Sequence, residues 1–247
     1  MMVISLELVP NNEELLSQQL SYTKSNYPEI EGINIPDLIK FDMRSWDGCK
    51  VAKKSYQRTI PHIRAMDIDL EEPLPMAKVL IENDINEVLI LTGDLPQDMN
   101  KKIYHSSTID VIRKFKTELP HIKVYGAIDQ YRDSFKSEML YIKRKLYAGV
   151  DGFFTQPFFD IRFMSIYEEM LSGTNVYFGI SPVLSAHSQN YWHAKNNVIF
   201  PEGFSTEYNW NIGFAKNAME FADSKNRNLY FMPIKTKLEL YLHSVFR

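Results

Sequence analysis

Carboxyl and amide side chains stand at or just after several short apolar runs in this sequence, where they could perform acid–base chemistry on a ligand. Glu7 lies inside the apolar run Val3–Leu8, and Asp94 and Gln156 each follow another such run. A strand-interior acid is seldom only a surface group. Carboxyl groups in one half-closed cavity repel each other, and burial raises their pKa, which keeps a proton on an acid near neutral pH. The pattern predicts general acid chemistry.

Each of these side chains also has a structural interpretation. Asp94 lies in a Thr-Gly-Asp-Leu-Pro turn that it could cap, and Gln156 alone would be a loop amide. His62 follows Pro61, and a histidine in such a position is more often a hydrogen-bonded core residue than a catalyst. The basic run 143–145 is typical of a solvated helix face, although one member could reach a phosphate. Residue type alone does not decide between these interpretations.

Eight short runs are rich in β-branched or aromatic residues and are apolar almost throughout, as in parallel strands buried on both faces. They are Val3–Leu8, Gly32–Ile35, Ile60–Ala65, Glu87–Leu91, Ile122–Ile128, Gly152–Thr155, Val176–Ile180 and Leu229–Met232. Helices are expected between them, from an N-cap at Asn12 and over 76–83, 107–119, 135–147, 161–171, 206–224 and 235–245. The helix over 107–119 is expected to be capped by Ser or Thr, and Gly149 is expected near the C-cap of the helix over 135–147. Residues 36–56 show no clear pattern.

Eight strands alternating with helices over 247 residues have the size and order of an α/β TIM barrel, (β/α)8. A doubly wound open sheet is the alternative, but it often carries a glycine-rich turn after its first strand, and Val9-Pro10-Asn11-Asn12 follows here. No composition break divides the chain, so residues 1–247 are expected to form a single barrel domain. Polar groups after the strands then converge on one mouth, which predicts one cavity around Glu7, Asp94 and Gln156.

Composition argues against several classes of protein. The formal net charge of −3 gives no electrostatic reason to expect nucleic acid or an anionic membrane as a partner. Cys49 is the only cysteine, which excludes an intrachain disulfide and a thiolate cluster, and no metal motif, Walker loop or G-x-G-x-x-G turn is present. No run approaches the ~18 apolar residues of a membrane span, and the opening residues do not resemble a signal peptide. A cytoplasmic protein with a small-molecule ligand and no metal is expected; a homo-oligomer stays open.

Five segments carry more specific patterns. They are Ser5-Leu-Glu7-Leu-Val-Pro10, Pro61-His62-Ile-Arg-Ala-Met-Asp67, Leu91-Thr92-Gly93-Asp94-Leu95-Pro96, the stretch 143–160 that ends in Thr155-Gln156-Pro-Phe-Phe-Asp160, and Gly179-Ile-Ser-Pro182-Val. In this order they resemble S-x-E-x-x-P, P-H-x-T-x-x-D, L-R-G-D-x-P, T-Q-x-F-F-D and G-I-x-P-[IV] of the methylenetetrahydrofolate reductase family. The resemblance implies a TIM barrel that uses FAD and NADH or NADPH to reduce 5,10-methylenetetrahydrofolate to 5-methyltetrahydrofolate, a one-carbon step linked to methionine biosynthesis.

The resemblance also implies roles for individual residues. Glu7 would be the general acid that helps open the bridged folate to an iminium. Asp94 would lie near flavin and folate, where its charge favours that cation. Gln156 would hydrogen-bond the pterin ring through its amide. Trp192 falls where the family has an aromatic residue packed on its substrates, and Lys235 falls where it often has an arginine near the substrate.

FAD contacts are implied for a further set, namely His62, Thr92, Gly93, Asp94, Tyr125, Asp129 and Lys145, with Lys145 on the diphosphate. Two residues depart from the family pattern: Thr92 replaces an arginine, and Asp129 stands near a position that is often histidine. They motivate an alternative enzyme that transfers a folate methyl or methylene group without flavin. A third hypothesis is a non-catalytic folate- or flavin-binding partner of a methyltransferase, against which the retained acid Glu7 argues.

Overall fold

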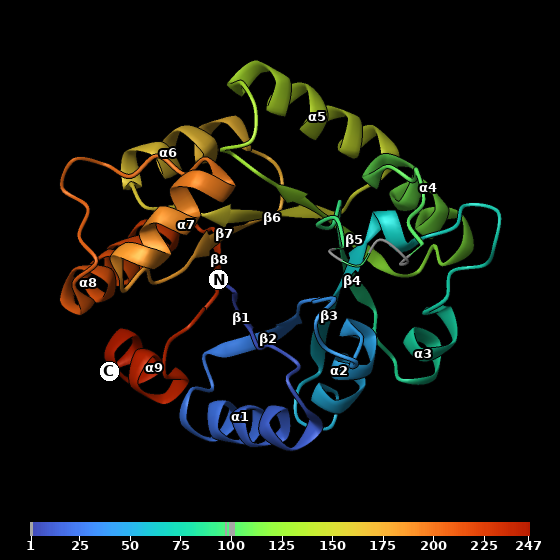
Figure 1. Cartoon of the computed structure of the whole chain (residues 1–247), viewed down its shortest axis with the longest axis horizontal. Coiled ribbons are helices and arrows are strands. Elements are labelled where there is room, and N and C mark those ends of the chain that lie inside the picture. Colours follow the sequence, from blue (N-terminus) through green and yellow to red (C-terminus); the bar gives the residue numbers. More distant parts are fainter. Residues whose placement is uncertain (1, 97, 99–101) are drawn as a thin grey trace.

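Within residues 2–96, 98 and 102–247, which the computed structural model describes, eight parallel strands close into a barrel in chain order (Figure 1). The strands are β1 Ile4–Glu7, β2 Ile30–Ile35, β3 Arg58–Arg64, β4 Glu87–Leu91, β5 Lys123–Ile128, β6 Gly152–Pro157, β7 Val176–Ile180 and β8 Asn228–Phe231. β8 pairs with β1 and completes the ring. The predicted TIM barrel is confirmed, and every predicted strand overlaps an observed one.

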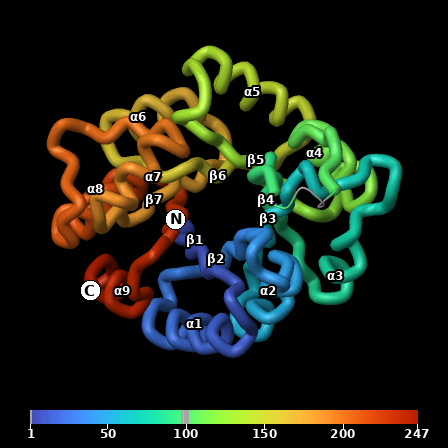
Figure 2. Tube along the Cα trace, viewed as in Figure 1, coloured from blue at the N-terminus to red at the C-terminus, as the bar shows by residue number. Residues whose placement is uncertain are grey.

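Helices form an outer ring around the strands (Figure 2). They are α1 Glu13–Asn26, α2 Ser45–Ala52, α3 Ala77–Glu82, α4 Thr108–Glu118, α5 Phe135–Ala148, α6 Ile161–Met170, α7 Ala186–Asn196, α8 Tyr208–Ser224 and α9 Leu238–Phe246, with a 3-10 turn η1 at Ala65–Asp67. The seven predicted helices are present, whereas α2, α7 and η1 were not predicted. α7 buries only Trp192, so its sequence carries no apolar stripe.

Local capping signals act as the sequence indicates. Asn12 accepts a hydrogen bond from the Leu15 amide at the start of α1, and Ser107 forms a reciprocal capping box with Asp110 at the start of α4. Gly149 ends α5 at φ 103°, a left-handed conformation that costs glycine little. These caps set where helices begin and end, and thereby the loops that carry the site.

Strand residues alternate between the barrel interior and the surrounding helices, because successive side chains point to opposite faces. Phe153 belongs to the large cluster that includes the apolar faces of the helices, and Phe154 belongs to a separate cluster inside the barrel. The interior cluster comprises Ile60, Leu89, Tyr125, Phe154, Tyr177, Tyr230 and Met232. Burial on both faces explains why the strands are apolar throughout.

Candidate functional site

Two adjoining cavities open among the loops that follow the strands. Cavity A has a volume of about 550 Å³ and is lined mainly by residues of β3, β4, β5 and β6 and the loops after them. Cavity B has a volume of about 610 Å³ and lies beside β1, α7 and the segment after β8. Both volumes are within the range of small-molecule sites. The two cavities share Glu7, Leu38, Trp192, Asn196 and Ile234.

The structure brings most of the predicted site residues together. Those that line cavity A are Glu7, His62, Thr92, Gly93, Asp94, Asp129, Lys145, Gln156 and Trp192. Lys235 lines cavity B together with Glu7 and Trp192. The predicted meeting of Glu7, Asp94 and Gln156 around one cavity is therefore observed, while their chemical roles stay predictions.

Tyr125 is the exception among the predicted site residues. It lines neither cavity but lies in the barrel interior, where its hydroxyl accepts a 3.1 Å hydrogen bond from Nη2 of Arg58. Arg58 also forms a 2.7 Å ion pair with Glu87. Arg58 and Glu87 are the first residues of β3 and β4, so this cluster closes the end of the barrel away from the cavities. The FAD contact that the resemblance implies for Tyr125 stays a prediction, and neither cavity includes this residue.

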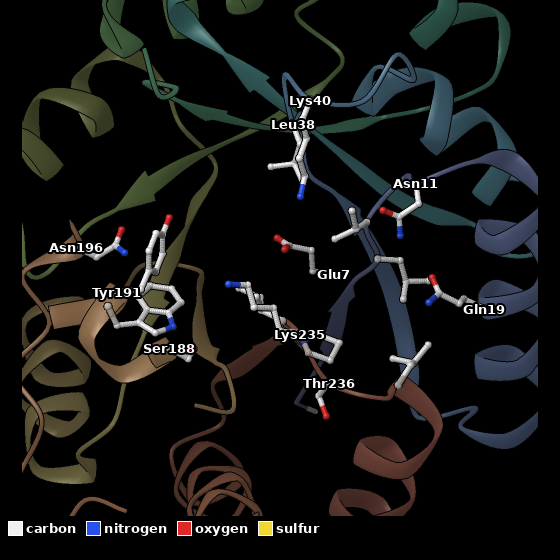
Figure 3. A pocket seen from close by; sticks show the side chains of 16 residues that line it. Glu7, Asn11, Gln19, Leu38, Lys40, Ser188, Tyr191, Asn196, Lys235 and Thr236 are labelled. Atoms are coloured by element: carbon white, nitrogen blue, oxygen red, sulfur yellow. The ribbon is translucent and has the colours of Figure 1, made fainter. Parts of the chain in front are cut away.

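Glu7 lines both cavities, and Figure 3 shows its carboxyl group directed into cavity B. The residue is half-buried, and burial raises the pKa of its carboxyl group to about 7, against the effect of a hydrogen bond from the Tyr230 hydroxyl to Oε2. Among the described residues, Oε1 has no hydrogen-bond partner. Glu7 can thus hold a proton near neutral pH and present it to a ligand.

A hydrogen-bonded chain crosses the barrel interior beside Glu7. The Ser5 hydroxyl donates to Asn34 Oδ1, and Asn34 Nδ2 lies 3.2 Å from His62 Nε2. Because the Asn34 amide donates to Nε2, the proton of the neutral imidazole is on Nδ1. Burial lowers the pKa of His62 to about 3, so the ring is uncharged. His62 is both a satisfied interior histidine and part of the wall of cavity A.

Arginines neutralise two carboxylates at the mouth. Arg44 contacts Asp37 at 2.7 Å and Asp67 at 3.0 Å, and Arg64 contacts Asp67 at 3.1 Å. Repulsion among rim carboxylates, expected from the sequence, is thereby relieved for Asp37 and Asp67. Sequence reasoning did not identify Arg44 because it lies at the N-cap of α2, in the segment without a clear pattern.

Lys145 and its neighbours form a buried charged cluster at the end of β5. Its side chain is 3% exposed, and its ammonium donates to the main-chain oxygen of Ala127. Burial lowers its pKa to about 8, opposed chiefly by the Glu138 carboxylate, while burial raises the pKa of Asp129. The interpretation of 143–145 as a solvated face holds for the two exposed members and is wrong for Lys145.

Gln156 and Trp192 offer an unpaired amide and an aromatic wall. The main-chain oxygen of Gln156 accepts a 2.8 Å hydrogen bond from Gln130 Nε2, which anchors the end of β6. Its side-chain amide makes no hydrogen bond within the described residues, although it borders cavity A. Trp192 packs against Phe159 with ring centroids 6.1 Å apart and borders both cavities. A planar polar ligand would find both surfaces.

Cavity B contains two lysines near Glu7. Figure 3 shows the amine ends of Lys40 and Lys235 directed toward the space beside the Glu7 carboxyl group. The Lys235 ammonium lies 5.7 Å from the centroid of the Tyr191 ring. Lys235 adopts φ 52°, a left-handed conformation that is uncommon outside glycine and is often found at binding sites. The lysines would suit a carboxylate-bearing part of a ligand.

Neither a metal centre nor a membrane helix is found in the described part of the chain. The described residues, which are all except 1, 97 and 99–101, contain no group of three or more His, Cys, Asp or Glu that could hold a metal ion. The helices in the same part are all too short or too polar to cross a bilayer.

Comparison with known proteins defines the family. The family profile described as Methylenetetrahydrofolate reductase matches residues 40–217, well over half of the chain. The chain belongs to the methylenetetrahydrofolate reductase family. The matched segment includes β3 to β7, while Glu7 and Lys235 lie outside it.

Curated methylenetetrahydrofolate reductases are longer than this chain. The 5,10-methylenetetrahydrofolate reductase of Buchnera aphidicola subsp. Schizaphis graminum is 25% identical over 165 residues, which are 65% of this chain and 56% of that protein. The Escherichia coli K12 enzyme is 28% identical over 102 residues, 41% of this chain and 34% of the enzyme. The chain thus spans about half or less of the curated reductases it matches.

Solved structures share the fold. A protein from Clostridium thermocellum, described as binding two copies of 5-methyl-5,6,7,8-tetrahydrofolic acid, superposes with a TM-score of 0.65 at 13% identity over 99% of this chain and 94% of its own. A 2,3-dimethylmalate lyase superposes with a TM-score of 0.62 at 8% identity, over 99% of this chain and 78% of its own. At these identities the likeness shows the barrel and no more.

Arg64 is a site residue that sequence reasoning missed. In the methylenetetrahydrofolate reductase motif P-H-x-T-x-x-D it stands at the threonine, and Thr92, just after the adjacent strand β4, stands at the arginine of L-R-G-D. Arg64 pairs in register with Leu91 and is 5% exposed, and it lines cavity A. A guanidinium is therefore present beside the Thr-Gly-Asp turn. Reading the two motifs together, rather than one at a time, could have indicated this exchange.

Proposed function

We propose that this chain binds a reduced folate at the barrel mouth and takes part in the reduction of 5,10-methylenetetrahydrofolate to 5-methyltetrahydrofolate, with FAD and NADH or NADPH. The observation that carries the proposal is that Glu7, Asp94 and Gln156 border one cavity. An acid, an anion and a two-sided amide are the groups this reaction requires. Membership of the reductase family supports the same assignment.

The residues of cavity A fit a flavin dinucleotide. Three cationic side chains, Arg64, Arg132 and Lys145, border the cavity and suit a diphosphate. Leu89 and Phe154 contribute apolar wall for a ring system. When bound, the flavin would supply the hydride. Arg64, although paired with Asp67, places a guanidinium beside Thr92, where the family has an arginine, which favours this proposal over the flavin-independent alternative.

The chain's own groups would then act as follows. Glu7 would donate the proton on Oε1 to the folate nitrogen that is released when the one-carbon bridge opens. The Asp94 carboxylate, exposed at the rim, would stabilise the resulting iminium cation. The unpaired Gln156 amide would fix the pterin orientation, while Trp192 would pack on its face and exclude water.

An absorbance spectrum tests the proposal at once. The purified chain, alone or after incubation with FAD, should show flavin bands that reduced nicotinamide bleaches and 5,10-methylenetetrahydrofolate restores, with 5-methyltetrahydrofolate as product. The Glu7→Gln variant should still bleach with nicotinamide but turn over folate far more slowly. A protein that neither retains nor accepts FAD would contradict the reductase. Folate turnover in such flavin-free protein would instead establish the transferase alternative.

A further inference from the structure

Tyr230 and Glu7 lie on the same inner face of neighbouring strands. Tyr230 in β8 pairs in register with Ser5 of β1, and Glu7 is two residues farther along the same face. The tyrosine side chain is 3% exposed, and its hydroxyl donates to Glu7 Oε2. This is the hydrogen bond that the Glu7 carboxyl group makes within the described residues. Both side chains border cavity A.

Packing fixes the direction of the Tyr230 hydroxyl. Its ring meets the Phe154 ring edge to face at 5.2 Å and the His62 ring at 6.3 Å. His62 is held in turn by Asn34. A buried ring with neighbours on several sides cannot swing away from its partner without displacing them. The hydroxyl is therefore a fixed donor aimed at one oxygen of Glu7.

We propose that Tyr230 is a positioning residue for Glu7: by donating to Oε2, it leaves the acid's proton on Oε1, the oxygen that faces the ligand. An oxygen that accepts a hydrogen bond is best used as the carbonyl oxygen of the protonated carboxyl group, so the proton resides on the other oxygen. The inference rests on the proposed function, in which Glu7 is the acid. Burial and the Glu7 charge raise the pKa of Tyr230, so it stays a donor.

The same hydrogen bond tunes the strength of the acid. Burial alone would make Glu7 a reluctant donor, and the bond from Tyr230 stabilises the carboxylate that remains after the proton has left. The other titratable or charged groups that border the two cavities are Asp37, Lys40, His62, Arg64, Asp94, Asp129, Arg132, Lys145, Tyr191, Lys195 and Lys235. Within the described residues none of these groups forms a hydrogen bond or ion pair with Glu7, so Tyr230 is its direct partner.

Infrared difference spectroscopy of the full chain tests the inference without any substrate. The protonated-carboxyl band that disappears in Glu7→Gln identifies Glu7 and can be followed with pH. Tyr230→Phe should move its titration upward by about one pH unit, since a hydrogen bond to a charged group contributes roughly 1.5 kcal/mol or more. Tyr177→Phe, which removes a hydroxyl from the same aromatic cluster away from Glu7, should leave the titration in place.

A second substitution at Tyr230 should shift the Glu7 titration in the opposite direction. Fluorotyrosine at position 230 keeps the ring shape but is a stronger donor, so it should move the Glu7 titration downward; it also serves if Tyr230→Phe does not fold. The alkaline limb of the pH–rate profile should follow each shift, with KM for folate nearly unchanged. If neither substitution at Tyr230 shifts the Glu7 titration, the inference is wrong. Shifted titrations without any folate turnover would retain the inference and refute the proposed function.

Discussion

Arg64 donates a 2.6 Å hydrogen bond from Nη2 to the main-chain oxygen of Asp94, joining the end of β3 to the turn after β4. Gly93 lies between these groups with φ +91°, and a Cβ at that position would come within 3.1 Å of the guanidinium carbon. The turn and the arginine therefore fit each other closely. The arginine, which is paired with Asp67, borders cavity A and holds the segment that presents Asp94.

Replacing Arg64 should weaken flavin binding more than it weakens the fold. Arg64→Thr is expected to lower FAD affinity about ten- to a hundredfold, because charge-assisted hydrogen bonds contribute about 1.5–3 kcal/mol each. The double exchange Arg64→Thr with Thr92→Arg should restore part of the affinity, since it returns a guanidinium to the adjacent strand. Flavin fluorescence titration measures both. Equal affinity for the native chain and Arg64→Thr would exclude this role.

Glu7 should make the protein less stable at alkaline pH. Its pKa is raised from 4.5 to about 7 in the folded chain. The stability that the protonated Glu7 contributes is therefore fully present below pH 4.5 and is lost as the pH rises through 7. Glu7→Gln should therefore exceed the native chain in unfolding free energy at pH 8 by up to about 3 kcal/mol, and match it near pH 4.5. Urea unfolding at both pH values tests this. Glu14→Gln, on the exposed side of α1, is the control and should show no such dependence.

Lys145 should make flavin binding pH-dependent. Burial lowers its pKa to about 8, so the ammonium that would face the diphosphate loses its charge as pH rises through 8. FAD affinity should fall by about tenfold between pH 7 and 9.5, the loss of one charge-assisted contact. Lys145→Met should bind weakly at pH 7 with little further change. Lys143→Met, two residues away and exposed, should behave as the native chain; a similar loss in both variants would contradict the assignment.

Tyr125 should be dispensable for the cofactor. Its hydroxyl bonds Arg58 at the closed end of the barrel, away from both cavities. Tyr125→Phe should keep native FAD affinity, while thermal unfolding registers a modest loss of stability of about 1 kcal/mol for the missing hydrogen bond. Flavin affinity reduced tenfold in a well-folded variant would reinstate the cofactor contact that the sequence suggests.

Local features of this protein were readable from the sequence because neighbouring residues decide them. The short apolar runs of the strands, the Asn12 and Ser107 caps and the glycine that ends α5 depend on residues a few positions apart. Strand ends in a closed barrel converge on one mouth, so Glu7, Asp94 and Gln156 could also be placed together. α7 was missed because an exposed helix with one buried residue leaves no periodic signal.

Tertiary structure decided which of these residues touch. Tyr230 meets Glu7 across 223 residues of sequence, and Arg64 meets the Asp94 turn because β3 and β4 pair in one particular register. The depth of Tyr125 inside the barrel follows from the register of β5 and the tilt of the closed sheet. Burial, which sets the protonation of Glu7, His62 and Lys145, arises only when distant segments remove water from a side chain, so no local pattern of residues encodes it.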